Sequence, residues 1–446
     1  MSHPWKFPYE YYRRSLDTLE TALGELSAYR SWRAYDPGAE CSVDNRYQAM
    51  PALTKEDIRR HFPDGFVPAD CDIQYGLNSR EISFVDTSGA TDDKVTNIWN
   101  QKWWNASERA SWKLNSFAAR LPLGEHPEAI LVNPLNVGIA SDDIDLPMEK
   151  RLCSRFLYLN EKTQLSLWTL QHMDRMIKEL AVFKPAILEA NPSYLAKLCR
   201  YVIKSKQTVF QPGLIVLTYE NPSEFHCRQI RQVFSAPIAS SYGTTESGYV
   251  FMQCEAGKFH QNSEYCRVDF QPLKREHGGP LLGRILVTTL NNPWYYLIRF
   301  DVGDLVRIDE NGKCACGRDS GIILSATEGR FVNATLTCNG RLVSFRELDN
   351  CLSAMEGINE YRMDQVSFDS YELKLVSQLQ DKQKLKQTAA SILKELYGKR
   401  ANVTVTFEEA ISPESSGKYR ISRALFPLNI EDYLEENLNP AKTEPH

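Results

Sequence analysis

The stretch Leu214-Ile215-Val216-Leu217 is a run of four apolar residues, and Ala129-Ile130-Leu131-Val132 is a second run of the same kind. Short continuous apolar runs are typical of parallel strands that are buried on both faces of a sheet. Helix-like material, such as residues 164–183, lies between them, and the alternation extends over about residues 80–325. It predicts an α/β domain, in which sites usually lie in loops at the carboxyl ends of the strands.

The N-terminal segment, up to about Asp70, has a helical pattern instead. Apolar residues recur at three- and four-residue intervals from Tyr12 to Leu26, as on one face of a helix. Pro51 introduces a turn, and Thr54 is suited to cap a helix that follows it. We therefore expect helices ahead of the α/β region.

The C-terminal segment changes character again. Residues 372–376 and 403–407 alternate between apolar and polar types, as strands do, and residues 385–396 mark one face of a helix. A strand–helix–strand unit of this kind is typical of a small α+β domain. We predict a large N-terminal α/β domain over residues 1–328 and a smaller α+β domain over residues 329–446.

The bulk composition narrows the function classes. The net charge of -5 gives no indication of a nucleic-acid partner or of binding to an anionic membrane surface. No apolar run is long enough to cross a bilayer, and no apolar signal core follows Met1, so we expect a cytoplasmic protein. The eleven cysteines, an odd number, favour reduced thiols over a disulfide framework.

A polar string, Asp86-Thr87-Ser88-Gly89-Ala90-Thr91-Asp92-Asp93-Lys94, follows a strand-like segment at residues 82–85. Backbone N–H groups of a loop that contains hydroxyls, a glycine and a lysine can surround a phosphate. The glycine spacing is not that of a Walker loop. The string is therefore either a phosphate-binding loop or a polar surface turn.

A second string, Ser240-Ser241-Tyr242-Gly243-Thr244-Thr245-Glu246, follows another strand-like segment. A tyrosine ring can stack on a purine, a threonine hydroxyl can bind a phosphate, and a glutamate can hold Mg²⁺ beside phosphate oxygens. The alternative for this string is a strand end followed by a helix cap.

Three later polar residues add to the candidate binding residues in these two strings. Asp304 follows a glycine, and its carboxylate could accept both hydroxyls of a ribose, although a simple turn would explain the pair equally well. Arg330 could bridge ribose or phosphate oxygens, or form an interdomain salt bridge. Lys418 ends the string Ser415-Ser416-Gly417-Lys418 near the end of the chain.

In this order, the strings resemble the signature motifs of the adenylate-forming superfamily of acyl-CoA synthetases and, within it, the phenylacetate–CoA ligase branch. The resemblance covers about residues 80–425. Supporting strings are Asn191-Pro192-Ser193-Tyr194, Gly283-Arg284-Ile285-Leu286-Val287-Thr288-Thr289-Leu290 and Cys314-Ala315-Cys316-Gly317-Arg318. It implies a large adenylation domain and a smaller mobile domain that carries a catalytic lysine.

The resemblance implies ATP, Mg²⁺ and CoA as ligands and a role for each motif. The nucleotide would be held by Ser88, Gly89, Thr91, Lys94, Ser241, Tyr242, Gly243, Thr244, Asp304 and Arg330. Thr245 would contact the α-phosphate, and Glu246 would bind Mg²⁺. Lys418 would bridge the attacking carboxylate and the α-phosphate, because a lysine charge offsets the repulsion between these two anions.

The chain departs from the family pattern at two places. The family's phosphate loop usually has a glycine before its lysine, whereas Asp92-Asp93 precedes Lys94 here. Two carboxylates would repel a triphosphate unless Mg²⁺ lies between them. The family also usually carries acidic residues after the Gly-Arg pair at the hinge, whereas Phe331-Val332-Asn333 follows Arg330 here.

Three cysteines and a histidine in two loops predict a metal site. Cys254 is followed by His260, and Cys314 by Cys316, a set that suits tetrahedral structural zinc with no open position. The branch includes zinc-bearing proteins with a similar arrangement. The alternative is a buried Cys254, a surface His260 and reduced thiols, and Cys266 is the nearest substitute ligand.

The resemblance implies an AMP-forming ligase that joins a carboxylic acid to CoA, and aromatic residues in the pocket would favour an aryl or small apolar acid. By position, the candidates for the acid pocket are Asn133, Pro134, Tyr194 and the segment from Tyr219 to Pro222, and ordinary loop packing is the alternative for each. An amine or a carrier-protein thiol could replace CoA as acceptor. A third hypothesis is a non-enzymatic family member, which binds nucleotide or a partner without turnover. Asp92-Asp93 favours this hypothesis. Related ligases are often dimers, so we also expect a homodimer.

Overall fold

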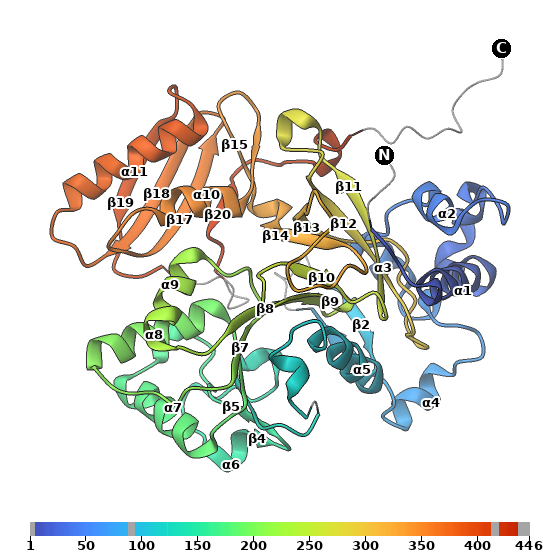
Figure 1. Ribbon diagram of the computed structural model, residues 1–446, viewed down its shortest axis with the longest axis horizontal. Coiled ribbons are helices and arrows are strands. Elements are labelled where there is room, and N and C mark those ends of the chain that lie inside the picture. Colours follow the sequence, from blue (N-terminus) through green and yellow to red (C-terminus); the bar gives the residue numbers. More distant parts are fainter. Residues whose placement is uncertain (1–4, 88–93, 123, 412–418, 436–446) are drawn as a thin grey trace.

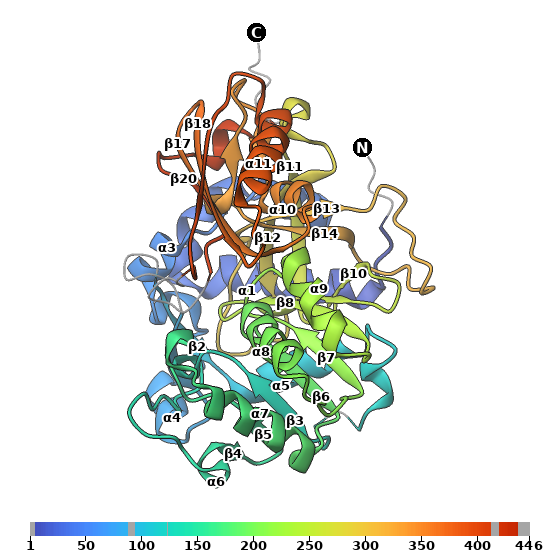
Figure 2. The ribbon, with the colours of Figure 1, turned by 90° about the vertical axis from the view of Figure 1, so that its left-hand side faces the viewer.

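The computed structural model describes residues 5–87, 94–122, 124–411 and 419–435 (Figure 1). A large α/β part is followed by a smaller α+β part, which confirms the predicted fold class. The two parts lie against each other, with the small sheet above helices of the large part in both views (Figures 1 and 2).

The first part of the chain is helical, as predicted. Its elements are α1 (Tyr9–Glu25), η1 (Ser27–Tyr35), α2 (Val43–Ala49), α3 (Lys55–His61), η2 (Asp64–Phe66) and α4 (Ile73–Asn78). Thr54 caps α3, because its hydroxyl accepts a 3.2 Å hydrogen bond from Asp57 N while the Asp57 carboxylate accepts one of 2.9 Å from Thr54 N. Leu19 and Ile58 share a core with Phe300, so these helices cover the antiparallel half of the large sheet.

One twelve-stranded sheet forms the centre of the large part, in the order β11-β12-β13-β14-β10-β9-β8-β7-β6-β3-β5-β4. Its parallel strands are β3 (Glu128–Leu131), β5 (Phe156–Tyr158), β6 (Ile187–Ala190), β7 (Leu214–Leu217) and β8 (Ile238–Thr244). Both apolar runs are confirmed as buried parallel strands, β3 and β7.

Helices cover both faces of these parallel strands. One face packs against α7 (Leu170–Phe183), α8 (Pro192–Ser205) and α9 (Glu224–Val233), and the other against α5 (Gln101–Trp112). Helix α7 is shorter than the predicted helical segment 164–183, because a separate short helix, η6 (Leu165–Leu167), precedes it.

Strand β8 joins two kinds of pairing. It runs parallel to β7 on one side and antiparallel to β9 (Gly248–Gln253) on the other. The other antiparallel strands are β10 (Phe259–Gln261), β11 (Cys266–Pro272), β12 (Leu282–Thr289), β13 (Phe300–Ile308) and β14 (Ile323–Arg330). The tyrosine motif therefore lies at the carboxyl end of a strand where the topology changes, a usual place for a ligand.

The remaining elements of the large part are short. They are β1 (Ser83–Asp86), β2 (Thr96–Trp99), η4 (Ala118–Arg120), η5 (Pro134–Asn136), α6 (Met148–Arg151), β4 (Leu152–Cys153) and η7 (Arg275–His277). Strands β1 and β2 form a separate antiparallel hairpin. No helix among the described residues is long and apolar enough to cross a membrane. All eleven cysteines are described and free of disulfide bonds.

The small part is built on a four-stranded sheet in the order β19-β18-β17-β20. Its elements are η8 (Phe331–Asn333), β15 (Thr335–Leu336), β16 (Leu342–Val343), α10 (Phe345–Ser353), β17 (Ile358–Ser367), β18 (Ser370–Ser377), α11 (Lys382–Tyr397), β19 (Asn402–Phe407), β20 (Ser422–Ala424) and η9 (Ile430–Asp432). The predicted strand–helix–strand unit corresponds to β18, α11 and β19. The chain then returns to the large part, where Leu434 bridges to Leu273.

Asp349 of α10 links the two parts. Its carboxylate accepts hydrogen bonds of 2.7 Å from Ser223 Oγ and from Glu224 N, at the start of α9. Tyr361 Oη of β17 adds a third bond of 2.9 Å. Asp349 is 3% exposed, so the first turn of a helix in the large part is capped by a buried carboxylate of the small part.

Candidate active site at the strand ends

Three predicted motifs meet at the carboxyl end of β8. Tyr242 Oη donates a 2.7 Å hydrogen bond to Asp304 Oδ2. Asp304 of β13 lies opposite Arg330 of β14. Gly303 has a φ of 79°, and a Cβ there would lie 3.3 Å from Arg330 Nη2, so the guanidinium rests against this glycine. The structure thus gathers a phenol, a carboxylate and a guanidinium from three separate strings.

The environment keeps the Tyr242 phenol protonated. Burial, followed by the Asp304 carboxylate, raises the pKa of Tyr242 well above its usual range, and Arg330 offsets a smaller part of this rise. The phenol is therefore a hydrogen-bond donor at neutral pH. Glu246 also raises this pKa, which places its buried carboxylate near the same ring.

The residues between β8 and β9 form a tight hairpin turn. Thr244 Oγ1 accepts a 3.1 Å hydrogen bond from Ser247 N. A Cβ on Gly243 would come within 2.3 Å of Gly248 O, so only a glycine fits there. Thr245 is half-buried in the turn. Because β8 runs through the motif and turns directly into β9, the alternative of a strand followed by a helix cap is wrong.

Some polar atoms at these strand ends are buried without a hydrogen-bond partner among the described residues. They include Ser241 Oγ and Asn221 Nδ2. Asn221 Oδ1 accepts a 2.7 Å hydrogen bond from Thr327 Oγ1 of β14, which orients the amide. An unmet buried polar atom costs about 1–3 kcal/mol, so these atoms mark a place that suits a polar ligand. Thr327 carries no signal in the sequence, because a lone threonine in a strand is ordinary.

The predicted phosphate loop begins and ends in the β1–β2 hairpin. Thr87 N donates a 3.0 Å hydrogen bond to Val95 O, and Thr87 Oγ1 accepts one of 3.1 Å from Val95 N. Lys94 is exposed, and its carbonyl accepts a 3.2 Å bond from Arg59 Nε. The predicted residues outside the described ranges are Ser88, Gly89, Thr91, Asp92, Asp93 and Lys418.

Tyr419, the residue after Lys418, contacts the large part. It packs against the core under α7–α9, and the pKa of its phenol is raised by burial and then by the charges of Glu360 and Glu220. Tyr419 and Ile411 both line a small cavity between the two parts. Residue 419 is thus close to the strand ends of the large part.

The four predicted pocket residues do not share one face of the sheet. Asn133 and Pro134 are buried directly after β3, and Asn133 lies near the Tyr194 hydroxyl. Tyr194 is fully buried in the core under α7–α9. Tyr219 instead donates a 2.6 Å hydrogen bond to Glu189, whose side chain points to the α5 face of β6.

A buried carboxylate cluster, made of Glu108, Glu128 and Glu189, lies on that α5 face. Tyr249 Oη donates a 3.0 Å hydrogen bond to Glu108, and Arg155 Nη1 donates one of 2.6 Å to Glu128. Burial and then Glu108 raise the pKa of Glu128 to about 7. Burial and then Glu128 raise the pKa of Glu189 well above its usual range. The sequence does not reveal this cluster, because each glutamate stands alone in its element.

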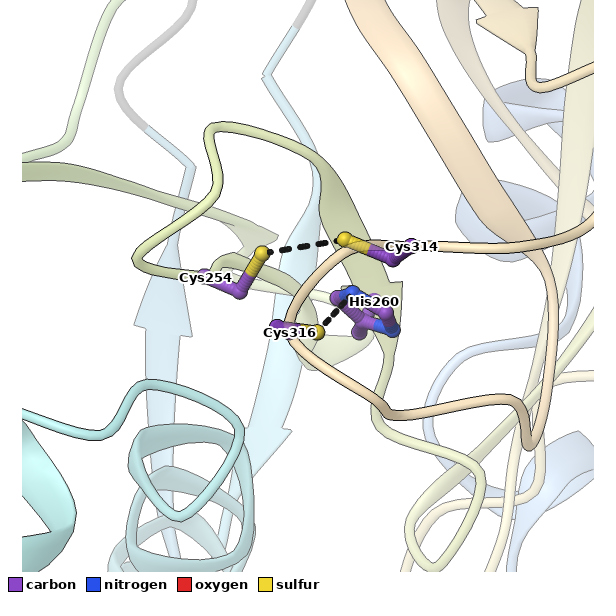
Figure 3. A group of neighbouring side chains, drawn as sticks. All are labelled: Cys254, His260, Cys314 and Cys316. Carbon is purple, nitrogen blue, oxygen red and sulfur yellow. Dashed lines mark hydrogen bonds between the residues drawn. The ribbon is translucent and has the colours of Figure 1, made fainter.

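The predicted metal ligands come together (Figure 3). Cys254 follows β9, His260 lies in β10, and Cys314 and Cys316 lie in the loop between β13 and β14. Their ligand atoms all lie within 4.8 Å of one another. Cys254 Sγ is 3.6 Å from Cys314 Sγ, and Cys316 Sγ is 3.3 Å from His260 Nε2. The pairing of β10 with both β9 and β14 explains this meeting.

The donor set fits zinc. His260 is buried, so the alternative that placed it on the surface is wrong. Burial and then Arg318 lower the pKa of His260 to about 4, so the imidazole is neutral at pH 7, as a metal ligand must be. Cys266 lies in β11, and its Sγ contacts Asn262 O at 3.4 Å, outside the four-residue group.

A second group of Asp145, Glu161 and His172 has ligand atoms equally close together. Glu161 accepts hydrogen bonds of 2.5 and 2.7 Å from Arg175, and Asp145 Oδ1 lies 2.9 Å from Lys162 Nζ. Because these cations already offset both carboxylates, we interpret this group as an ion-pair network and not as a metal site.

Comparison with known proteins gives matches among solved structures alone. No protein-family model matches the chain, and no curated protein matches it. 2-Hydroxyisobutyryl-CoA ligase, in the postadenylation state with R3-HIB-AMP, has a TM-score of 0.70 and 16% identity, covering 94% of this chain and 91% of that chain. The amide bond synthetase McbA from Marinactinospora thermotolerans has a TM-score of 0.52 and 12% identity, covering 86% and 82%.

A third solved structure, the anthranilate CoA ligase AuaEII in complex with anthranoyl-AMP, has a TM-score of 0.51. Its identity is 14%, and the match covers 84% of this chain and 73% of that chain. Sequence identities this low support a shared fold and do not show a shared reaction. The chain has the fold of the adenylate-forming CoA ligases.

Proposed function

We propose that this protein activates a carboxylic acid with ATP and transfers the acyl group to CoA. The acid carboxylate attacks the α-phosphorus of ATP, which forms an acyl-adenylate and releases pyrophosphate. The CoA thiol then attacks the acyl carbon, which forms the thioester and releases AMP. The observation that carries this proposal is the meeting of Tyr242, Asp304 and Arg330 at the carboxyl end of β8.

In this proposal the residues around Tyr242 bind the nucleoside. The Tyr242 ring packs on adenine, and its hydrogen bond orients Asp304. A carboxylate has acceptor sites beyond that one bond, so Asp304 can also accept the ribose hydroxyls. Arg330 offsets negative charge beside them. The remaining nucleotide contacts are Ser241, Gly243, Thr244 and Lys94, together with Ser88, Gly89 and Thr91.

In this proposal, residues of the β8–β9 turn and Lys418 interact with the phosphates of ATP. Thr245 contacts the α-phosphate in this proposal. Glu246, a buried carboxylate, suits Mg²⁺, which would neutralise the departing pyrophosphate. Lys418 supplies positive charge between the attacking carboxylate and the α-phosphate. Tyr419, which follows Lys418 in the chain, packs against the large part, and this contact supports the role.

We assign Cys254, His260, Cys314 and Cys316 to a structural zinc ion. Four protein ligands leave no open position, so the ion would stabilise the fold and not take part in the reaction. The ion would connect the end of β9 and strand β10 to the loop between β13 and β14. Strand β13 carries Asp304.

We propose a chemical class for the acid and for the acceptor. The acid is aryl or small and apolar, and it enters from the strand ends near Asn133, Pro134, Tyr194 and Tyr219. CoA is the first acceptor. An amine is the second, because the fold is also that of an amide bond synthetase. Cytoplasmic location and a homodimer stay predictions.

ATP–pyrophosphate exchange with a panel of aryl and short-chain acids tests the first step. Exchange that depends on one class of acid supports adenylation. AMP release with CoA, hydroxylamine or amines, measured on the active acid, then identifies the acceptor. Tight ATP binding without exchange for any acid would favour the non-enzymatic reading.

A further inference from the structure

Tyr219 has an unusual backbone conformation. Its φ is 72°, a left-handed value that a bulky aromatic residue rarely adopts. Residues held in this region persist only where the surroundings stabilise them, and they concentrate at functional sites. A glycine would take the same conformation without strain.

The backbone of Tyr219 lies at the nucleotide end of the sheet. Residue 219 comes two positions after Leu217, the last residue of β7, and Leu217 pairs with Ser240 of β8. Tyr242, which contacts Asp304, comes two positions after Ser240, so residue 219 follows β7 beside the strand that carries the tyrosine motif. Two residues farther on, Asn221 reaches Thr327 of β14.

The side chain of Tyr219 points away from that end. Its hydroxyl donates a 2.6 Å hydrogen bond to Glu189 Oε1 in the carboxylate cluster. Burial, followed by Glu189, raises the pKa of the phenol well above its usual range, so it stays a donor. The ring therefore occupies the space between the nucleotide end of β7 and the carboxylate cluster.

Hydrogen bonds and a cation hold the carboxylate cluster behind Tyr219. Among the described residues, Arg155 is the cation that pairs with it, at 2.6 Å from Glu128 and 3.9 Å from Glu108. His126 lies 3.3 Å from Glu128, but burial lowers the pKa of His126, so this ring is neutral. Burial raises the pKa of Glu128 and of Glu189, so the cluster retains protons instead of carrying three full negative charges.

We propose that Tyr219 determines the length of the acid that the protein accepts, an inference that rests on the proposed function. The acid carboxylate must lie at the nucleotide end to attack ATP. An acyl chain that extends from there along β7 meets the Tyr219 ring, which closes the way to the carboxylate cluster. The accepted acid is therefore short.

The variant Y219G tests this inference, because glycine removes the ring and also relieves the left-handed strain. Y219F is the matched control, since it keeps the ring and loses only the bond to Glu189. ATP–pyrophosphate exchange would be measured for straight-chain acids from acetate to decanoate and for aryl acids. Should Y219G fail to fold, Y219N replaces it, because asparagine tolerates this backbone.

For the wild type and Y219F we expect kcat/KM to fall as the acid lengthens. For Y219G we expect kcat/KM for longer acids to rise about tenfold or more relative to acetate. An unchanged length profile in folded Y219G, or an equal change in Y219F, overturns the inference while leaving adenylation intact. Absence of exchange in all variants with every acid overturns the proposed function, and this inference with it.

Discussion

Tyr242 Oη lies 2.7 Å from Asp304 Oδ2, although β14, β10 and β9 separate their strands in the sheet order. Neighbouring strands are about 4.8 Å apart, so a flat sheet would hold β8 and β13 about 19 Å from each other. The hydrogen bond therefore requires the antiparallel half of the sheet to curl until β13 faces the end of β8. That curl creates the proposed nucleoside site.

Replacing Tyr242 with phenylalanine should weaken ATP binding. The loss of a buried hydrogen bond of about 0.5–1.5 kcal/mol predicts a KM for ATP that rises about two- to tenfold. Initial-rate kinetics of adenylate formation measure this change. The exposed Tyr35→Phe is the control. An unchanged KM for ATP would remove Tyr242 from the nucleotide site.

Replacing Lys418 with alanine should separate the two half-reactions. Adenylation should slow by about 10²–10³-fold, because a charge that stabilises the transition state is lost. Thioester formation from a supplied acyl-adenylate should stay close to that of the wild type. Lys204→Ala, an exposed residue of α8, controls for loss of charge. Equal losses in both half-reactions would contradict the assigned role.

Stability should fall as pH rises through the carboxylate cluster's titration range. The pKa of Glu128 is raised from 4.5 to about 7, so between these values the folded state binds more protons than the unfolded state. The free energy of unfolding then decreases with pH, by up to about 1.4 kcal/mol per unit. Urea unfolding from pH 5 to 8 measures the slope.

Glu128→Gln should flatten this slope, whereas the exposed Glu125→Gln should leave it as in the wild type. A slope in Glu128→Gln as steep as that of the wild type would show that another group causes the pH dependence.

Zinc should copurify with protein that carries no affinity tag. Metal analysis should find about one equivalent, since a structural site remains filled in the folded protein. Cys254→Ser should lose the metal and lower Tm, whereas the exposed Cys153→Ser should change neither. Less than about half an equivalent of zinc in the folded wild-type protein would contradict the zinc assignment.

Replacing Asp349 with alanine should loosen the two parts. Three donors would lose their buried acceptor, so we expect a loss of about 2–3 kcal/mol in the free energy of unfolding. Urea denaturation with fluorescence detection measures it, and the exposed Glu356→Gln serves as the control. A shift no larger than that of the control would mean that other contacts hold the parts together.

Local patterns predicted much of the fold. The apolar runs at β3 and β7 and the alternation in β18 and β19 depend on neighbours in the chain, so the sequence reveals them. The Thr54 cap is equally local. For the tyrosine motif, the alternative of a strand end followed by a helix cap is wrong. Helix caps and hairpin turns use the same polar and glycine residues, so the sequence alone does not distinguish them.

The sequence by itself determined the order of the motifs, the α/β and α+β classes, and the pairing of Cys254 and His260 with Cys314 and Cys316. These depend on residue type and on spacing along the chain. Only the tertiary structure decided which residues touch across the sheet: Tyr242 with Asp304, Tyr219 with Glu189, and Ser223 with Asp349. Such contacts depend on strand order, sheet curvature and the docking of two parts, and these arise from packing between segments distant in the chain.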